Sequence, residues 1–124
     1  MVDPTPHDLQ QFLDEAPDRP FVMLNLLRYA EGGRELYTDY LRRAESFVEA
    51  AGARVLFFGK GLPALVPDRE RSWDAVMLVW YPSPAAFCAM AEDEAYAEVA
   101  QLRSRALSEA VLQPTTVIAV DRPD

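Results

Sequence analysis

An asparagine inside an apolar run is the first feature of this sequence that could take part in chemistry. Residues 19–29 read RPFVMLNLLRY, and Asn25 stands in the middle of the hydrophobic stretch. A buried amide left without hydrogen-bond partners costs about 1 to 3 kcal/mol, so a buried Asn25 must be satisfied. Two interpretations stay open: a core amide bonded to neighbouring protein atoms, or an amide that faces a ligand in a cavity.

Arg103 is a second polar residue on an apolar face. It follows Tyr96 by seven residues and shares a helical stripe with Val99 and Ala106. A buried guanidinium needs an opposite charge, either a carboxylate of the protein or an anionic ligand. The sequence therefore predicts a partner for Arg103 and leaves a structural ion pair and a ligand contact as alternatives.

Arg28 ends the same run as Asn25 and could hold an anion at the mouth of a cavity. We expect the first and third strands to lie parallel, which would place Arg28 near Trp80 and Tyr81. The alternative is a guanidinium that extends into solvent or pairs with a carboxylate such as Glu35.

Aromatic residues accompany these polar positions. Tyr37 and Tyr40 lie on the predicted inward side of one helix, and Trp73, Trp80 and Tyr81 flank a predicted strand. Such spacing is more typical of core packing than of a cofactor site, although buried hydroxyl and indole groups still need hydrogen-bond partners.

Several kinds of catalytic centre lack the residues that they require. His7 is the only histidine, so a Ser/His/Asp triad, a two-histidine metal site and a histidine-ligated haem are all poorly supported. Cys88 is the only cysteine, which excludes an intramolecular disulfide and favours a small buried hydrophobe over a reactive thiol. No glycine-rich phosphate loop is present. We predict no metal and no organic cofactor.

Length and charge narrow the class of protein further. The 124 residues suit one domain, and a net charge of −8 with scattered basic residues argues against nucleic-acid binding. No apolar run approaches the roughly 18 to 20 residues of a membrane helix, and the first residues do not resemble a signal peptide. The expected protein is soluble and cytoplasmic.

Hydrophobic periodicity and turn residues predict seven elements. The expected helices span residues 5–17, 35–52 and 83–111, the last with a kink near Glu92 where Asp93 can cap a second piece. The expected strands span 21–29, 53–61, 73–82 and 113–122, and in the last of these residues 115–120 are nearly all β-formers. We divide the chain into an N-terminal helical extension, residues 1–18, and one domain, residues 19–124.

This order, after the leading helix, is the βαββαβ pattern of the α+β ferredoxin-like fold, a four-stranded antiparallel sheet with two main helices on one face. The predicted strands are apolar at both odd and even positions, so both faces of the sheet should be covered. The chain has no further elements for the second face. We therefore expect a homodimer in which two sheets pack together.

The segments FVMLNLLRY, VLFFGKG, WDAVMLVWYPSPAAFCAM and DEAYAEVAQLRSRAL, in this order, resemble the bacterial family called domain of unknown function 1330. That family is similar to the dimeric α+β barrel proteins, which include cofactor-independent monooxygenases, lactone-isomerising enzymes and haem-binding members. The resemblance implies a fold and a dimer more firmly than a reaction. It also implies a ligand cavity between the sheet and the helices of each subunit.

Two functions follow as hypotheses. The favoured one is a small dimeric protein that binds or acts on an apolar, aromatic or carboxylated molecule without metal or organic cofactor, in a monooxygenase-like or isomerase-like way. The alternative is a non-catalytic dimer that binds a ligand or only assembles. The candidate ligand-binding residues are Asn25, Arg28, Tyr40, Trp80, Tyr96 and Arg103; no catalytic residue is assigned.

Overall fold

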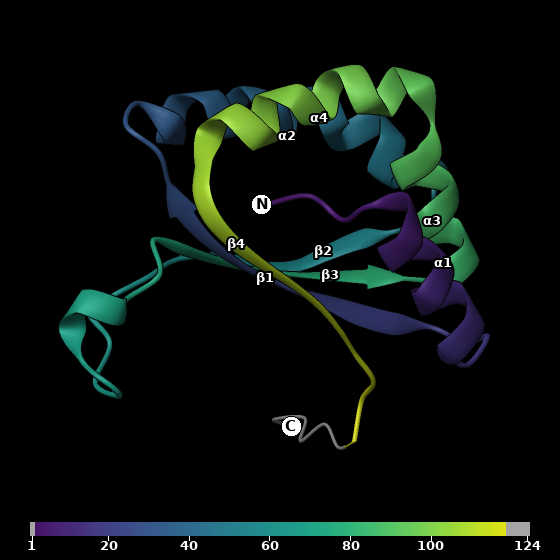
Figure 1. Ribbon diagram of the computed structural model, residues 1–124, viewed down its shortest axis with the longest axis horizontal. Helices are drawn as coiled ribbons and strands as arrows, with labels where there is room; N and C mark the ends of the chain where they lie inside the picture. Colours follow the sequence, from purple (N-terminus) through teal and green to yellow (C-terminus); the bar gives the residue numbers. More distant parts are fainter. Residues whose placement is uncertain (1, 119–124) are drawn as a thin grey trace, which may run out of the picture.

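One antiparallel sheet with the strand order β2-β3-β1-β4 forms the centre of the protein. The computed structural model describes residues 2–118 (Figure 1). The strands are β1 (Phe21–Tyr29), β2 (Arg54–Lys60), β3 (Ala75–Tyr81) and β4 (Leu107–Thr115). The helices are α1 (Pro6–Glu15), α2 (Gly33–Ala50), α3 (Pro84–Glu92) and α4 (Glu94–Ala106), with a short 3-10 helix at Arg69–Arg71. The predicted α+β ferredoxin-like fold with an added N-terminal helix is confirmed.

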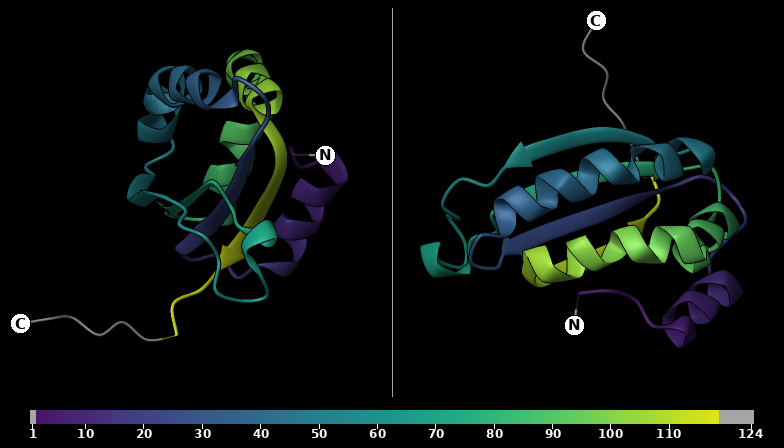
Figure 2. Two further views of the ribbon diagram at one scale, coloured as in Figure 1. Left: turned by 90° about the vertical axis from the view of Figure 1, so that its left-hand side faces the viewer. Right: turned by 90° about the horizontal axis from the view of Figure 1, so that it is seen from above.

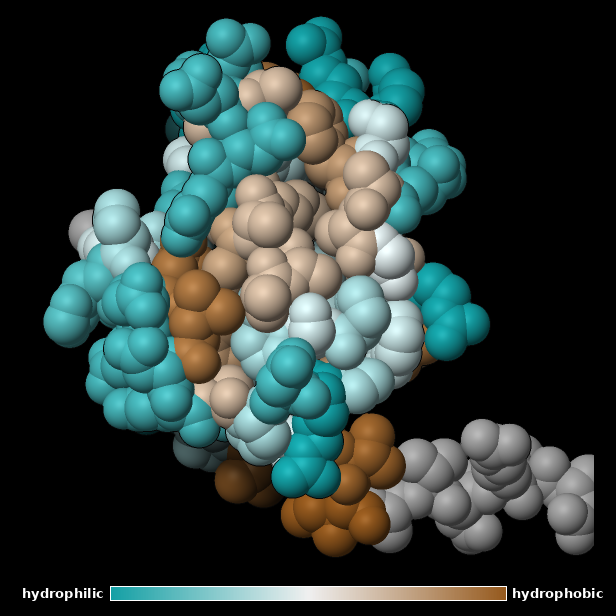
Figure 3. Space-filling model, turned by 90° about the vertical axis from the view of Figure 1, so that its right-hand side faces the viewer, coloured by the Kyte–Doolittle hydropathy of each residue, from teal (hydrophilic) through white to brown (hydrophobic). Residues whose placement is uncertain are grey.

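The described helices cover one face of the sheet and leave the other face open (Figures 1 and 2). Helices α2 and α4 lie side by side over the opposite face, and α1 and α3 lie together at one end of the molecule (Figures 1 and 2). The connection between β2 and β3 extends away from the body of the protein as an arm (Figure 1). The fold therefore has two layers, with the hydrophobic core between them. At the end of the molecule where α1 and α3 lie, hydrophilic residues surround a more apolar central surface (Figure 3).

Successive side chains of the central strand β1 alternate between buried and partly buried, which distinguishes the two faces of the sheet. In β1 the side chains of Phe21, Met23, Asn25 and Leu27 are buried toward the helices. The intervening residues are only partly buried, as expected because successive side chains of a strand point to opposite faces. The facing strand β3 repeats the pattern, so Asn25 belongs to the helix-covered face.

Local sequence signals set the helix boundaries. Thr5 and Asp8 form a reciprocal capping box at the start of α1. Ser83 caps α3, and Asp93 ends that helix and caps α4, which confirms the predicted break. No helix within residues 2–118 is long and apolar enough to cross a membrane.

Three expectations about the strands and the last helix were wrong. Strand β3 runs antiparallel to β1, because the chain reverses between β2 and β3. Strand β4 is formed by Leu107–Thr115 rather than by residues 113–122, of which 119–122 lie outside the described part. The last helix stops at Ala106 because pairing with β1 takes the following residues into the sheet.

Candidate ligand-binding pocket

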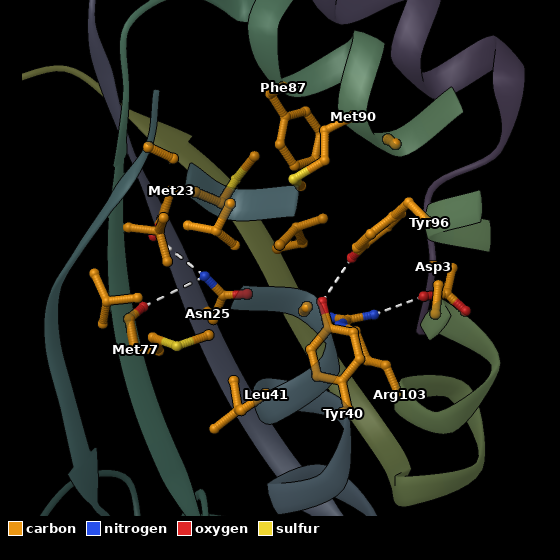
Figure 4. A pocket seen from close by; sticks show the side chains of 18 of the residues that line it. Asp3, Met23, Asn25, Tyr40, Leu41, Met77, Phe87, Met90, Tyr96 and Arg103 are labelled. Atoms are coloured by element: carbon orange, nitrogen blue, oxygen red, sulfur yellow. Dashed lines mark hydrogen bonds and ion pairs between the residues drawn. The ribbon is translucent and has the colours of Figure 1, made fainter. Parts of the chain in front are cut away.

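A cavity of about 600 Å³ lies between the sheet and helices α2, α3 and α4. Side chains of β1, β2, β3 and β4 form its floor, and the segment before α1 borders it. Among the lining residues are the apolar Met23, Leu41, Ala44, Val55, Phe58, Met77, Val79, Phe87, Met90 and Leu112 and the polar Asp3, Asn25, Tyr37, Tyr40, Tyr96 and Arg103. Figure 4 shows many of these side chains around the space.

The Asn25 amide lies on the floor of the cavity. Its Nδ2 donates to the carbonyl oxygens of Met23 at 3.3 Å and Met77 at 3.4 Å, both at the long end of hydrogen-bond geometry. The amide oxygen points away from these two carbonyls (Figure 4). Asn25 therefore has features of both alternatives: its amide nitrogen is bonded to backbone carbonyls, and its side chain also lines the cavity.

Two tyrosines meet across the helical roof. The hydroxyl oxygens of Tyr40 on α2 and Tyr96 on α4 are 2.6 Å apart and share a hydrogen bond (Figure 4). Tyr37 lies one helical turn before Tyr40 and is 1% exposed, yet its hydroxyl has no hydrogen-bond partner among the described residues. A polar region of three tyrosine hydroxyls therefore occupies one part of an otherwise apolar cavity.

Arg103 lies beside these hydroxyls and is almost fully buried. Its Nη1 donates to Asp3 Oδ1 at 2.7 Å and to the carbonyl oxygen of Val2. Its Nη2 is buried and has no hydrogen-bond partner within residues 2–118. The structure thus supplies the predicted carboxylate partner but satisfies only part of the guanidinium.

Burial sets the charge state of this region. Loss of solvent raises the pKa of Tyr37, Tyr40 and Tyr96, and the Arg103 guanidinium only partly offsets that rise. The neighbouring tyrosines and Asp3 outweigh the cost of burying Arg103, so its pKa is raised. At neutral pH the region holds protonated hydroxyls next to a cation.

This arrangement can bind an anionic or strongly polar group and stabilise a developing oxyanion by hydrogen bonds. The deep tyrosines are poor general bases because they hold their protons. In residues 2–118 no three His, Cys, Asp or Glu side chains come together as a metal site would require. The chemistry that the residues support is recognition of a molecule with one polar end.

Four of the six sequence candidates line this cavity: Asn25, Tyr40, Tyr96 and Arg103. The other two, Arg28 and Trp80, do not line it.

The predicted proximity of Arg28 to Trp80 and Tyr81 was wrong, because antiparallel pairing puts Trp80 opposite Val22 at the far end of β1. Arg28 instead lies over the Trp73 ring at 4.4 Å and pairs with Glu109 at 2.6 Å. The proposed partner Glu35 is not the one used.

Sequence reasoning missed Asp3. Its carboxylate reaches Arg103 from 100 positions away in the chain, and no local pattern around it signals a pocket residue. Tyr37 was recognised only as an inward-facing aromatic residue. Its hydroxyl lacks a hydrogen-bond partner among residues 2–118 because of the tertiary structure, which residue spacing alone does not reveal.

Comparison with solved structures agrees with this fold. A protein of unknown function from Rhodopseudomonas palustris is 29% identical, with a TM-score of 0.86 over 96% of this chain and 98% of that one. A NIPSNAP-like domain protein from Burkholderia xenovorans is 10% identical, with a TM-score of 0.60 over 86% of this chain and 92% of that one. A candidate antibiotic biosynthesis monooxygenase from Caulobacter crescentus is 9% identical, with a TM-score of 0.57 over 82% and 92%.

At such low identity, the last two likenesses concern the fold alone. No curated protein matches the chain. The family model described as domain of unknown function (DUF1330) matches residues 29–113, which include β1's last residue and nearly all of the later elements. The chain therefore belongs to the DUF1330 family.

Proposed function

We propose that the protein binds a small, mainly apolar or aromatic molecule in the cavity between its sheet and helices. The observation that carries this proposal is a pair of buried polar atoms beside the cavity, the Tyr37 hydroxyl and Arg103 Nη2, which form no hydrogen bond of good geometry within residues 2–118. Native proteins rarely leave such atoms unpaired, and a ligand with a polar end would supply the missing partner.

The size and lining of the cavity support a small-molecule ligand. About 600 Å³ falls inside the range of roughly 300 to 1,000 Å³ that is usual for such sites. Met23, Met77, Phe87 and Met90 offer apolar and polarisable contacts, which suit an aromatic body. The polar region then fixes the orientation of the ligand, because its hydrogen bonds can form at only one end.

Thermal-shift screening with aromatic acids, phenols and quinones tests this proposal. We expect at least one class to raise the melting temperature. Replacing Ala100, which lines the cavity on α4, by Phe should abolish the shift by filling the space. The matched control is Ala95→Phe, at an exposed position of the same helix that does not line the cavity. Absence of any shift, confirmed by calorimetry, would favour the non-catalytic assembly role instead.

A reaction through an oxyanion is the second candidate function. It is favoured by one observation: the Arg103 cation and protonated tyrosine hydroxyls surround the same part of the cavity. Turnover of a bound phenol or carbonyl compound, followed by oxygen uptake and product analysis, would support it. A compound that binds tightly and is recovered unchanged, with Arg103→Gln giving the same result, would support binding alone.

We further propose a homodimer formed through the open face of the sheet. Leu24 and Leu26 of β1 and Leu78 of β3 lie on this face, opposite to the core positions. Phe57 of β2 pairs with Leu78 and is 52% exposed. A second sheet would remove these apolar side chains from water. Light scattering tests the assembly, and a monomeric mass at micromolar concentration would contradict it.

A further inference from the structure

Within residues 2–118, Arg103 forms one ion pair, between its Nη1 and the carboxylate of Asp3. Asp3 belongs to the segment that precedes α1. This segment lies beside α4 and borders the cavity (Figures 1 and 4). The Asp3 side chain is 39% exposed, whereas the Arg103 side chain is 6% exposed. An arginine fixed in the core is thus paired with a carboxylate at the surface.

The contact between Asp3 and Arg103 involves one of the two terminal nitrogens of the guanidinium. Only Nη1 of Arg103 contacts Asp3, through Oδ1, and the second carboxylate oxygen accepts from the Ser104 hydroxyl. A carboxylate that bonded Nη1 and Nη2 together would form the two-pronged pair that arginine favours. A ligand carboxylate that bonded both nitrogens in this way would replace Asp3 at Nη1, while Nη2 supplies the second bond.

We propose that the ligand of this pocket carries a carboxylate, which takes the place of Asp3 on Arg103 when the ligand binds. This inference rests on the proposed function and names the chemical class of its ligand. The hydroxyls of Tyr37, Tyr40 and Tyr96 lie close enough to Arg103 to interact electrostatically with it. Tyr37 and whichever of Tyr40 and Tyr96 accepts their shared hydrogen bond can each donate to a ligand. The ligand is thus a monocarboxylate with an apolar or aromatic body.

Charge argues for one negative charge rather than two. Arg103 is the cation next to the three tyrosines, and the other cationic residue of the lining, Arg54, lies over the Trp80 ring at 5.0 Å. Glu45 and Glu49, which are exposed, also line the cavity. A dianionic group such as a phosphate monoester would meet a single deep cation and these carboxylates, which favours a monoanion.

The local structure allows Asp3 to leave without unfolding α1. The capping box of Thr5 and Asp8 fixes the start of that helix, and Leu9 is buried against the core. Residues 2–4 precede this anchor and form no regular structure. The Asp3 side chain can therefore turn away from Arg103 into solvent, while Val2 stays packed against the core and the helix stays in place.

The test compares a carboxylate with its neutral analogue. The probes are 3-phenylpropionate and 3-phenylpropanamide, which share a ring and chain and differ in charge, and the measurement is titration calorimetry on the whole chain at neutral pH. The variants are Asp3→Asn, which removes the competing charge, and Asp14→Asn. The latter is the matched control, since Asp14 lies on α1, bonds Gln10 and changes the net charge equally.

We expect Asp3→Asn to strengthen binding of the acid by about tenfold. In the wild type the ligand carboxylate replaces one charged partner of Arg103 by another, whereas in the variant it replaces a weaker contact with a neutral amide. Binding of the neutral analogue should change less than about twofold, and Asp14→Asn should leave both affinities within the same limit. In the wild type, the acid but not the amide should shift the nuclear magnetic resonance signals of Asp3 and Ser104.

Two results would overturn this inference while leaving the proposed function intact. One is equal affinity of wild type and Asp3→Asn for the acid, and the other is an acid affinity no greater than that of the amide in Asp3→Asn. Failure of both probes and of the wider compound panel to bind any variant would contradict the proposed function itself. Because Asp3 is half exposed, its variant tests the idea even if an Arg103 variant does not fold.

Discussion

The hydroxyl oxygens of Tyr40 and Tyr96 lie 2.6 Å apart and form a hydrogen bond between helices α2 and α4. The same two rings pack edge to face, with centroids 6.5 Å apart. This pair fixes the distance between the two roof helices directly above the cavity. The lining of the cavity and the packing of the helical layer therefore depend on the same side chains.

Removing either hydroxyl should destabilise the protein. Tyr40→Phe and Tyr96→Phe should each lower the free energy of unfolding by about 1 to 2 kcal/mol, since each leaves a buried hydroxyl without its partner. The double variant should lose less than the sum of the two. Urea unfolding measures these changes. Tyr29→Phe, at the edge of the core, is the control, and strict additivity of the pair would contradict the coupling.

The tyrosines should ionise at a higher pH in the folded protein than in the unfolded chain. Burial raises the pKa of Tyr37, Tyr40, Tyr81 and Tyr96. The folded state therefore binds more protons than the unfolded state above pH of about 10, where a free tyrosine titrates. Stability from these groups is complete below that pH and falls as the pH rises above it.

Absorbance at alkaline pH measures this difference. The native protein should show little tyrosinate signal near pH of about 10, and the same protein in urea should show about half of its maximum. Equal titration curves in the two states would contradict the burial of the four hydroxyls. Unfolding experiments at increasing pH should show the free energy of unfolding decreasing over the same window.

A methyl group at Gly33 should disturb the start of α2. A Cβ built there would lie 2.0 Å from the carbonyl oxygen of Ala106, which already accepts from the Ala30 amide at 2.8 Å. Gly33→Ala should lower the free energy of unfolding by about 1 to 3 kcal/mol, as overpacking does. Glu31→Ala, in the same turn but exposed, should change it little. Wild-type stability of the glycine variant would show that the two segments can separate freely.

A charge on the open face of the sheet should prevent dimer formation. Leu78→Lys places an ammonium group beside Leu24, its partner on β1, in the centre of that face. We expect light scattering to report half the mass of the wild type, with the far-ultraviolet circular dichroism unchanged. The control is Leu13→Lys on the outer side of α1. A dimeric mass for Leu78→Lys would place the interface elsewhere.

The element order was predictable because local signals agree with the tertiary structure. Proline and serine at the start of α3, and Asp93 between α3 and α4, determine helix ends through the backbone groups of the first turn. The apolar strands were equally clear. Asn25 and Arg103 could be singled out because polar residues on apolar faces need partners, whatever the fold.

Other features depend on contacts that the sequence does not encode locally. The end of α4 reads as helix in sequence, yet Leu107 pairs with Tyr29 across the sheet and begins a strand. The position of Arg28 was misjudged because strand direction, not residue type, decides which end of β3 it meets. Asp3 was missed because its partner is distant in the chain.

Strand β1 interleaves two surfaces along nine residues. Its odd-numbered side chains contribute to the cavity and the core, and its even-numbered side chains form the open face. Substitutions can therefore change one surface and spare the other, which gives a protein engineer two independent sets of positions on a single strand. Insertion or deletion of one residue would exchange the two sets at once, so β1 can vary in composition but not in length.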